Sequence, residues 1–134
     1  MVDAVGTTAY SYDPVGQLLS ENGPWTNDTV SYTYTNRLRT GLSLLQPNTS
    51  PWTESYGYDS SRRLTSLTSA AGTFGYTYSP VQMERVVGLS LGDGANIANT
   101  YDSVARLTGT YLHDSGGSLL DQYAYGYNLA GQRT

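Results

Sequence analysis

The sequence of 134 residues contains no cysteine, one histidine and one phenylalanine, and only 13% of its residues are charged. Without cysteine there can be neither a disulfide framework nor a thiolate metal site. The formal net charge of -4 argues against nucleic-acid binding, which needs a basic surface to neutralise phosphates. No apolar run approaches the length of a membrane span, and the first twenty residues lack a secretory signal pattern. The chain is therefore expected to be cytosolic, or exported by a signal on a longer parent.

The residues that are abundant favour an ordered fold. The chain has 13 tyrosines and 15 glycines, and 38% of its residues are hydrophobic. This apolar content supplies material for packing, so intrinsic disorder is the weaker interpretation. The length suits a single domain, and we expect one repeat array over residues 1–134.

Internal repetition is the most informative feature of the sequence. Six segments share a tyrosine that is preceded two residues earlier by Tyr or Asn and followed by a short polar residue. Consecutive anchor tyrosines are 22, 24, 20, 23 and 26 residues apart. The six anchors are Tyr12, Tyr34, Tyr58, Tyr78, Tyr101 and Tyr127.

The segments around the anchors alternate with a period of two, which is typical of β-strands. In Ser31-Tyr32-Thr33-Tyr34, for example, both tyrosines fall on one face of a strand. A turn-rich stretch and a second alternating run follow each anchor, as in residues 63–68. Two strands per repeat predict eleven or twelve strands in all. The expected fold is all-β, built from antiparallel β-hairpin repeats, with essentially no helix.

The position after each anchor carries a short side chain with an oxygen acceptor. Such side chains accept a hydrogen bond from a backbone N–H two positions further on, which ends a strand and starts a turn. The alternative, that the aspartates are catalytic or bind calcium, is weaker because Thr and Ser occupy the same position in other repeats. The predicted turn-forming residues are Asp13, Thr35, Asp59, Ser79, Asp102 and Asn128.

The choice of tyrosine over phenylalanine also has a physical interpretation. An enclosed apolar core would favour phenylalanine, whereas a tyrosine hydroxyl needs a polar partner or an exit to water. We therefore expect the anchor rings to lie along a sheet surface with their hydroxyls reaching polar atoms or solvent. The alternative is a platform on which sugars stack, and exposed rings without hydroxyl partners would support it.

Three repeats resemble the YD-repeat (Rhs-repeat) motif, Tyr-Asp-x-x-Gly-Arg-Leu. They are the segments Tyr12–Leu18, Tyr58–Leu64 and Tyr101–Leu107, and the six copies together cover almost the whole chain. Two copies depart from the motif. The segment Tyr34–Leu38 is two residues short, and the segment Tyr78–Met83 reads Ser-Pro-Val-Gln-Met after its tyrosine.

The resemblance implies a β-ribbon that spirals, as in bacterial Rhs proteins, toxin-complex shells and teneurins. Members of this family are typically secreted or on the cell surface, some enclose toxins, and some have been linked to carbohydrate. The expected function is thus a non-enzymatic structural segment of an extracellular shell, tube or filament. The alternatives are a carbohydrate-binding surface module and a fragment of a larger toxin-encapsulating shell.

The array is expected to be open at both ends, because it stops where a further strand should follow. A single hairpin cannot offset its own ordering cost, so each repeat needs neighbours to stack on. Unpaired edge strands are templates for pairing with another chain. The expected partners are copies of this chain in head-to-tail association, or the rest of a longer array. No cofactor is implied.

Candidate enzymatic features have simpler structural interpretations. His113 is followed by Asp114, but no nucleophile elbow accompanies them, so we expect a turn histidine. Residues 92–94 read Gly-Asp-Gly without the lysine and helix of a phosphate loop. Asp13-Pro14 superficially resembles a self-cleaving segment but occupies an ordinary repeat position. We therefore predict no catalytic, metal-binding or cofactor-binding residue.

Overall fold

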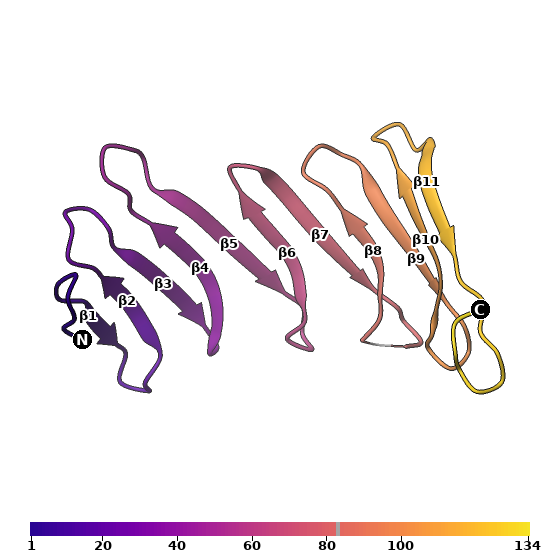
Figure 1. Ribbon diagram of the computed structural model, residues 1–134, viewed down its shortest axis with the longest axis horizontal. Coiled ribbons are helices and arrows are strands. Elements are labelled where there is room, and N and C mark those ends of the chain that lie inside the picture. Colours follow the sequence, from indigo (N-terminus) through magenta and orange to yellow (C-terminus); the bar gives the residue numbers. More distant parts are fainter. Residues whose placement is uncertain (83) are drawn as a thin grey trace. The chain divides into compact units, whose positions relative to one another are not determined.

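The computed structural model describes residues 1–82 and 84–134, in which the regular structure consists of β-strands only. The strands follow one another in chain order without a crossover connection (Figure 1). They are β1 (Ala9–Tyr12), β2 (Leu18–Asn22), β3 (Val30–Thr35), β4 (Leu38–Leu44), β5 (Trp52–Tyr58), β6 (Leu64–Ser69), β7 (Gly72–Tyr78), β8 (Val86–Ser90), β9 (Asn96–Tyr101), β10 (Leu107–His113) and β11 (Leu119–Ala124). The predicted all-β fold of antiparallel hairpins, with eleven or twelve strands, is confirmed.

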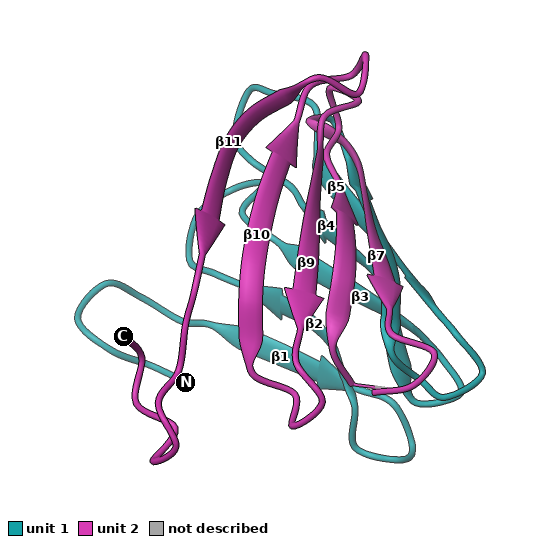
Figure 2. Ribbon diagram, turned by 90° about the vertical axis from the view of Figure 1, so that its right-hand side faces the viewer, with its two compact units in different colours: residues 1–70 teal, residues 71–134 magenta. Residues whose placement is uncertain are grey.

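The chain divides into two compact units, coloured separately in Figure 2. The first unit, Met1–Ala70, contains β1 to β6, and the second, Ala71–Thr134, contains β7 to β11. Within each unit every strand is antiparallel to the next one along the chain. Met83, which ends the fourth predicted repeat, lies outside the described residues. No helix that could cross a bilayer occurs in the part of the chain that is described.

Most hairpins of the repeats share one five-residue turn. In the turn at residues 102–106, the Asp102 N–H donates to the Arg106 carbonyl, and the Ala105 N–H donates to the Asp102 carbonyl. The fourth residue of such a turn takes a positive φ, which glycine adopts without a steric penalty. Glycine occupies this position in the turns that begin at Asp13, Leu91, Asp114 and Asn128. Arg62 and Ala105 occupy it in the other two turns, with φ of 65° and 66°.

The turn after Tyr34 differs from the expectation, because Thr35 does not start it. Thr35 is the last residue of β3 and pairs with Leu38, the first residue of β4. Only Asn36 and Arg37 lie between the strands, with φ of 52° and 65°. Two central residues with positive φ form the tight hairpin turn that matches the twist of paired strands. A backbone turn of this kind leaves no role for a Thr35 hydroxyl acceptor, so the prediction for Thr35 is wrong.

Strand register in the first unit separates large side chains from small ones. On one face, Tyr32 lies opposite Leu42, and Tyr56 lies opposite Leu67. We call this the tyrosine face. On the other face, serine, threonine and glycine oppose one another, in the pairs Ser11–Ser20, Ser20–Ser31, Ser31–Ser43, Ser43–Thr53, Thr33–Gly41, Gly41–Ser55, Ser55–Thr68 and Gly57–Ser66. The alternation in the sequence therefore divides the two faces by residue size and polarity.

Very little of the chain is fully buried. Among the described residues only Ala95 and Gly109 are buried, whereas the large side chains of the tyrosine face are half-buried. Gly109 is covered by a side chain of its own strand, since a Cβ there would come within 2.7 Å of the Tyr111 hydroxyl oxygen. Strands thus stabilise one another through cross-strand contacts rather than through an enclosed core.

Candidate functional site: tyrosine anchors and the turn edge

Each anchor tyrosine lies where a strand meets the turn of its repeat. Tyr12, Tyr58, Tyr78 and Tyr101 are the last residues of β1, β5, β7 and β9, and Tyr34 is next to last in β3. Tyr127 lies beyond β11 and forms an isolated bridge with Arg133. We call the row of turns that follows these anchors within each unit the turn edge.

Three anchor hydroxyls donate to backbone carbonyls of the preceding strand. Tyr58 donates to the Arg39 carbonyl at 2.8 Å, Tyr101 to the Val86 carbonyl at 3.0 Å and Tyr127 to the Leu107 carbonyl at 2.7 Å. The accepting carbonyls belong to β4, β8 and β10, so each bond links one hairpin to the hairpin before it. Phenylalanine could not make these bonds, which explains the choice of tyrosine at these three anchors. Rings tied to the backbone in this way act as structural links.

The short polar residues after the anchors accept backbone N–H groups of their own turns. The Oδ1 atom of Asp13 accepts from Val15 and Gln17, and that of Asn128 accepts from Ala130 and Gln132. Asp102 accepts from Val104 and Arg106 in the same way, Asp59 accepts from Arg63, and Ser79 Oγ accepts from Val81 and Gln82. These bonds satisfy turn N–H groups that a tight reversal leaves without backbone partners.

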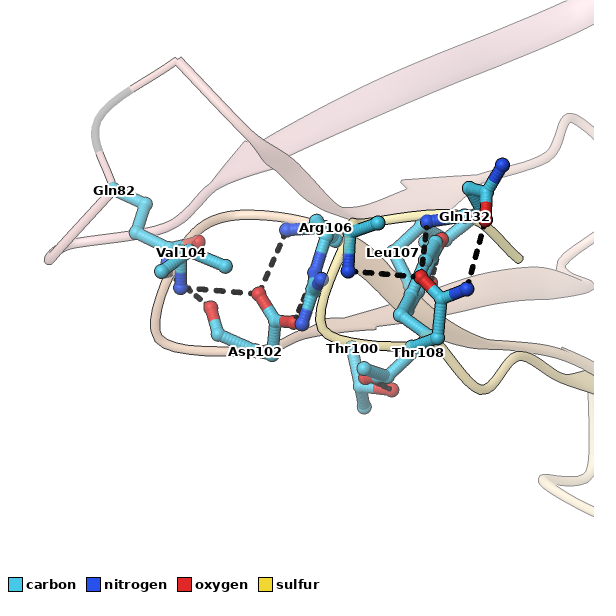
Figure 3. A network of polar contacts seen from close by, with 11 residues as sticks. Gln82, Thr100, Asp102, Val104, Arg106, Leu107, Thr108 and Gln132 are labelled. Carbon is cyan, nitrogen blue, oxygen red and sulfur yellow. Dashed lines mark hydrogen bonds and ion pairs between the residues drawn. The ribbon is translucent and has the colours of Figure 1, made fainter. Parts of the chain in front are cut away.

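Two turns also carry an ion pair. The Asp102 carboxylate lies 2.7 Å from the Arg106 guanidinium (Figure 3), and Asp59 pairs with Arg63 at 2.7 Å. The pKa values of Asp59 and Asp102 lie below their ordinary value, chiefly because the backbone N–H of the paired arginine donates to the carboxylate. The arginine side chain lowers each pKa further. The Asp and Arg positions of the motif therefore work as a unit, whereas the sequence predicted only the turn-forming role of the aspartates.

Neighbouring turns are joined by side chains that reach backbone carbonyls. Gln82 Nε2 donates to the Asp102 carbonyl at 2.8 Å (Figure 3), and Arg62 Nη2 donates to the Asn36 carbonyl at 3.1 Å. The Arg106 guanidinium carbon lies 4.6 Å from the centre of the Tyr127 ring, within the range of a cation–π contact. The turn edge is therefore cross-linked from repeat to repeat within each unit.

A second cluster lies on the tyrosine face of the first unit. The Arg39 guanidinium carbon is 5.8 Å from the Tyr32 ring centre and 4.9 Å from that of Tyr56. Glu54 accepts from Trp52 Nε1 at 3.2 Å and from the Tyr56 hydroxyl. The Tyr56 bond, followed by the Trp52 bond, lowers the pKa of Glu54, while burial and Glu54 raise the pKa of Tyr56. No repeat of the sequence motif pointed to this cluster.

The first unit contains a groove of about 510 Å³ at its turn edge. One wall comes from the hairpin that holds the short turn and includes Thr35, Asn36, Leu38 and Thr40. The other wall comes from the end of β5 and the turn after it and includes Tyr56, Tyr58, Asp59, Ser60 and Arg62. A groove of this volume is in the size range of small-molecule sites.

Asp114 and Asp93 lie in turns, whereas His113, which the sequence placed in a turn, is the last residue of a strand, so that prediction is wrong. His113 ends β10, and its Nδ1 atom is buried without a hydrogen-bond partner. Asp114 Oδ1 instead accepts from Gly116 and Ser118, so it serves its own turn. Asp93 accepts from the Ala95 N–H in the turn between β8 and β9. Within residues 1–82 and 84–134, no three acidic or histidine side chains are grouped so that they could hold a metal ion.

No family model matches this sequence, and no curated protein matches it. Solved structures that are similar to the chain come from Tc toxin complexes. They are crystal structures of TcdB2-TccC3, alone and with Cdc42, and the structure of the Photorhabdus luminescens Tc holotoxin pore with a mutated TccC3. Each match has 14% sequence identity and a TM-score of 0.40 and covers 98% of this chain. This chain covers only 10–11% of the matched chains.

Proposed function

We propose that this chain is a non-enzymatic structural module, a segment of an extracellular shell, tube or filament that grows by strand pairing. The observation that best supports this proposal is that very few residues are buried. Within the described residues, only Ala95 and Gly109 are. A β-sheet normally buries one face against a second layer. A chain of eleven strands with so little burial is better suited to extend a larger sheet than to enclose a catalytic cleft.

The two outermost strands support this proposal. All residues of β1 and of β11 are exposed, including Leu120, whose exposed fraction is 60%, and Tyr123, at 57%. Within the described residues, β11 pairs only with β10, and β1 pairs only with β2. Exposed strands with apolar side chains pair readily with further strands. The incoming strand would come from a copy of this chain or from further repeats of a longer array.

The contacts of the anchor rings favour a structural role over a sugar-binding platform. Tyr58, Tyr101 and Tyr127 use their hydroxyls for backbone carbonyls of the preceding strand. A stacking platform would keep its hydroxyls available to the ligand. The carbohydrate alternative is best tested at Tyr12, the anchor whose side chain is 59% exposed.

Sedimentation velocity and negative-stain electron microscopy over a range of concentrations test the proposal. We expect oligomers or filaments whose population grows with concentration. Leu120→Lys places a charge on β11 and should reduce this association several-fold, since charged side chains on edge strands oppose pairing. Val104→Lys, which adds the same charge at an exposed turn position, is the matched control. If the chain stays monomeric at all concentrations, it does not assemble with copies of itself. The partner strands would then have to come from a longer array.

A further inference from the structure

The groove of the first unit exists because two neighbouring turns differ in length. The turn after Tyr34 has two residues, Asn36 and Arg37, whereas the turn after Tyr58 spans residues 59–63. Arg62 of the longer turn donates to the Asn36 carbonyl of the shorter one at 3.1 Å. The space of about 510 Å³ lies between these two turns and the strands that lead to them.

The charge balance in the groove favours an anion. Its charged lining residues are Asp59 and Arg62. The Asp59 carboxylate is already paired with Arg63, at 2.7 Å from both Nε and Nη2. Arg62, by contrast, donates a hydrogen bond to a neutral carbonyl, that of Asn36. A guanidinium carries five N–H donors in a planar fork that matches a carboxylate, so Arg62 can still bind one.

The remaining walls are apolar or weakly polar. Tyr56 and Tyr58 line the groove, but their hydroxyls are bound to Glu54 and to the Arg39 carbonyl. The two rings, together with Leu38, therefore contribute mainly apolar surface to a ligand. The hydroxyls of Thr35, Thr40 and Ser60 add neutral hydrogen-bonding groups.

The backbone at Arg62 follows the pattern of the other five-residue turns. Its φ of 65° lies in a region that costs a non-glycine residue free energy, and the equivalent residues Gly16 and Gly131 avoid that cost. Ala105 occupies the same conformation without a long side chain. What distinguishes Arg62 from Ala105 is a long cationic side chain on a residue that lines a groove.

We propose that the groove binds a small carboxylate-bearing ligand with an aromatic or branched aliphatic body. The carboxylate pairs with the guanidinium of Arg62, and the body packs against Tyr56, Tyr58 and Leu38. The volume accommodates a molecule of roughly ten to twenty heavy atoms, in the range of small-molecule sites.

Titration of the ¹⁵N-labelled full chain with 3-phenylpropionate, followed by nuclear magnetic resonance, tests this proposal. We expect saturable shifts confined to residues 35–40 and 56–62. The neutral analogue 3-phenylpropanamide should bind about tenfold more weakly because it lacks the charge, and propionate should bind about tenfold more weakly because it lacks the ring. Equal binding of the acid and its amide, or shifts that lie elsewhere, would overturn the proposal.

Two variants separate a binding role of Arg62 from a structural one. Arg62→Gln should weaken 3-phenylpropionate binding at least tenfold, while Arg37→Gln, at the turn position outside the groove lining, should leave it unchanged. Inserting Gly-Ser between Asn36 and Arg37 lengthens the short turn and should abolish binding by filling the groove. If the insertion prevents folding, the Arg62→Gln result decides. If Arg62→Gln binds 3-phenylpropionate with the affinity of the wild type, the proposal is wrong.

Discussion

The turns after Tyr34 and Tyr101 both reverse the chain, but different interactions stabilise them. The turn after Tyr101 is held by a side chain, because Asp102 accepts two backbone N–H groups and pairs with Arg106. The turn after Tyr34 is held by backbone geometry, with positive φ at both Asn36 and Arg37. The comparison shows that the repeat conserves the reversal of the chain and not the interaction that produces it. A shortened turn loses the carboxylate and leaves a groove beside its longer neighbour.

The largest expected effect comes from removing the carboxylate of the longer turn. Asp102→Ala leaves two turn N–H groups without their acceptor and breaks the pair with Arg106. We expect Tm to fall by about 5 °C, measured by circular dichroism. Thr35→Ala, at the equivalent position of the short turn, should change Tm by less than about 1 °C. Equal losses in the two variants would contradict the distinction between the turns.

Lowering the pH should also destabilise the longer turns, with a smaller fall in Tm than Asp102→Ala causes. The pKa values of Asp59 and Asp102 are lowered in the folded chain, so their contribution is complete above the unfolded value of about 4. It is lost as the pH falls through that value toward the folded pKa. The loss is smaller than in the alanine variant because a protonated carboxyl still accepts hydrogen bonds. Tm measured from pH 7 to pH 2.5 should fall more steeply in the wild type than in an Asp59→Asn, Asp102→Asn double variant.

The hydroxyl links between hairpins can be tested without disturbing the rings. Tyr58→Phe removes the bond to the Arg39 carbonyl and should lower the free energy of unfolding by about 1 kcal/mol. Tyr12→Phe, at an anchor whose side chain is 59% exposed, should have an effect below about 0.5 kcal/mol. Urea denaturation measures both values. A larger loss at Tyr12 than at Tyr58 would show that hydroxyl links do not hold the hairpins together.

The smallest expected effect is a gain in the free energy of unfolding. Ala105→Gly relieves a residue with φ of 66° and should stabilise the longer turn by about 0.5 kcal/mol. Asn36→Gly in the short turn should be near neutral, since asparagine tolerates a positive φ. The same urea experiment compares the two. Destabilisation by Ala105→Gly would mean that the unfolded-chain entropy of glycine outweighs the relief of strain.

Several features of the fold could be predicted from the residues because they depend on local chemistry. The period-two alternation around Tyr32 and Tyr34 predicted the strand, and its repetition predicted eleven or twelve strands. The Thr35 prediction failed because the loss of two residues forces a turn made by the backbone alone. The spacing of the repeats places a short acceptor side chain after each anchor tyrosine. It does not show whether that side chain forms the turn or only precedes it.

Contacts between repeats could not be predicted, since they depend on strand register. The bulge between Gly57 and Tyr58 shifts the pairing of β5 with β6 by one residue. Which carbonyl lies within reach of the Tyr58 hydroxyl follows from the pairing of β4 with β5, and no spacing in the sequence specifies it. The Arg39 contact with Tyr32 and Tyr56 likewise joins three strands.

The sequence by itself determined the strands, their antiparallel hairpins and the turns that begin with a short acceptor side chain. These features follow from backbone preferences and from contacts within a few residues. Only the tertiary structure decided which hydroxyl meets which carbonyl, which arginine stacks on which ring, and that a shortened turn leaves a groove beside Arg62. Such contacts join residues about twenty positions apart, and their geometry is set by the register in which neighbouring strands pair.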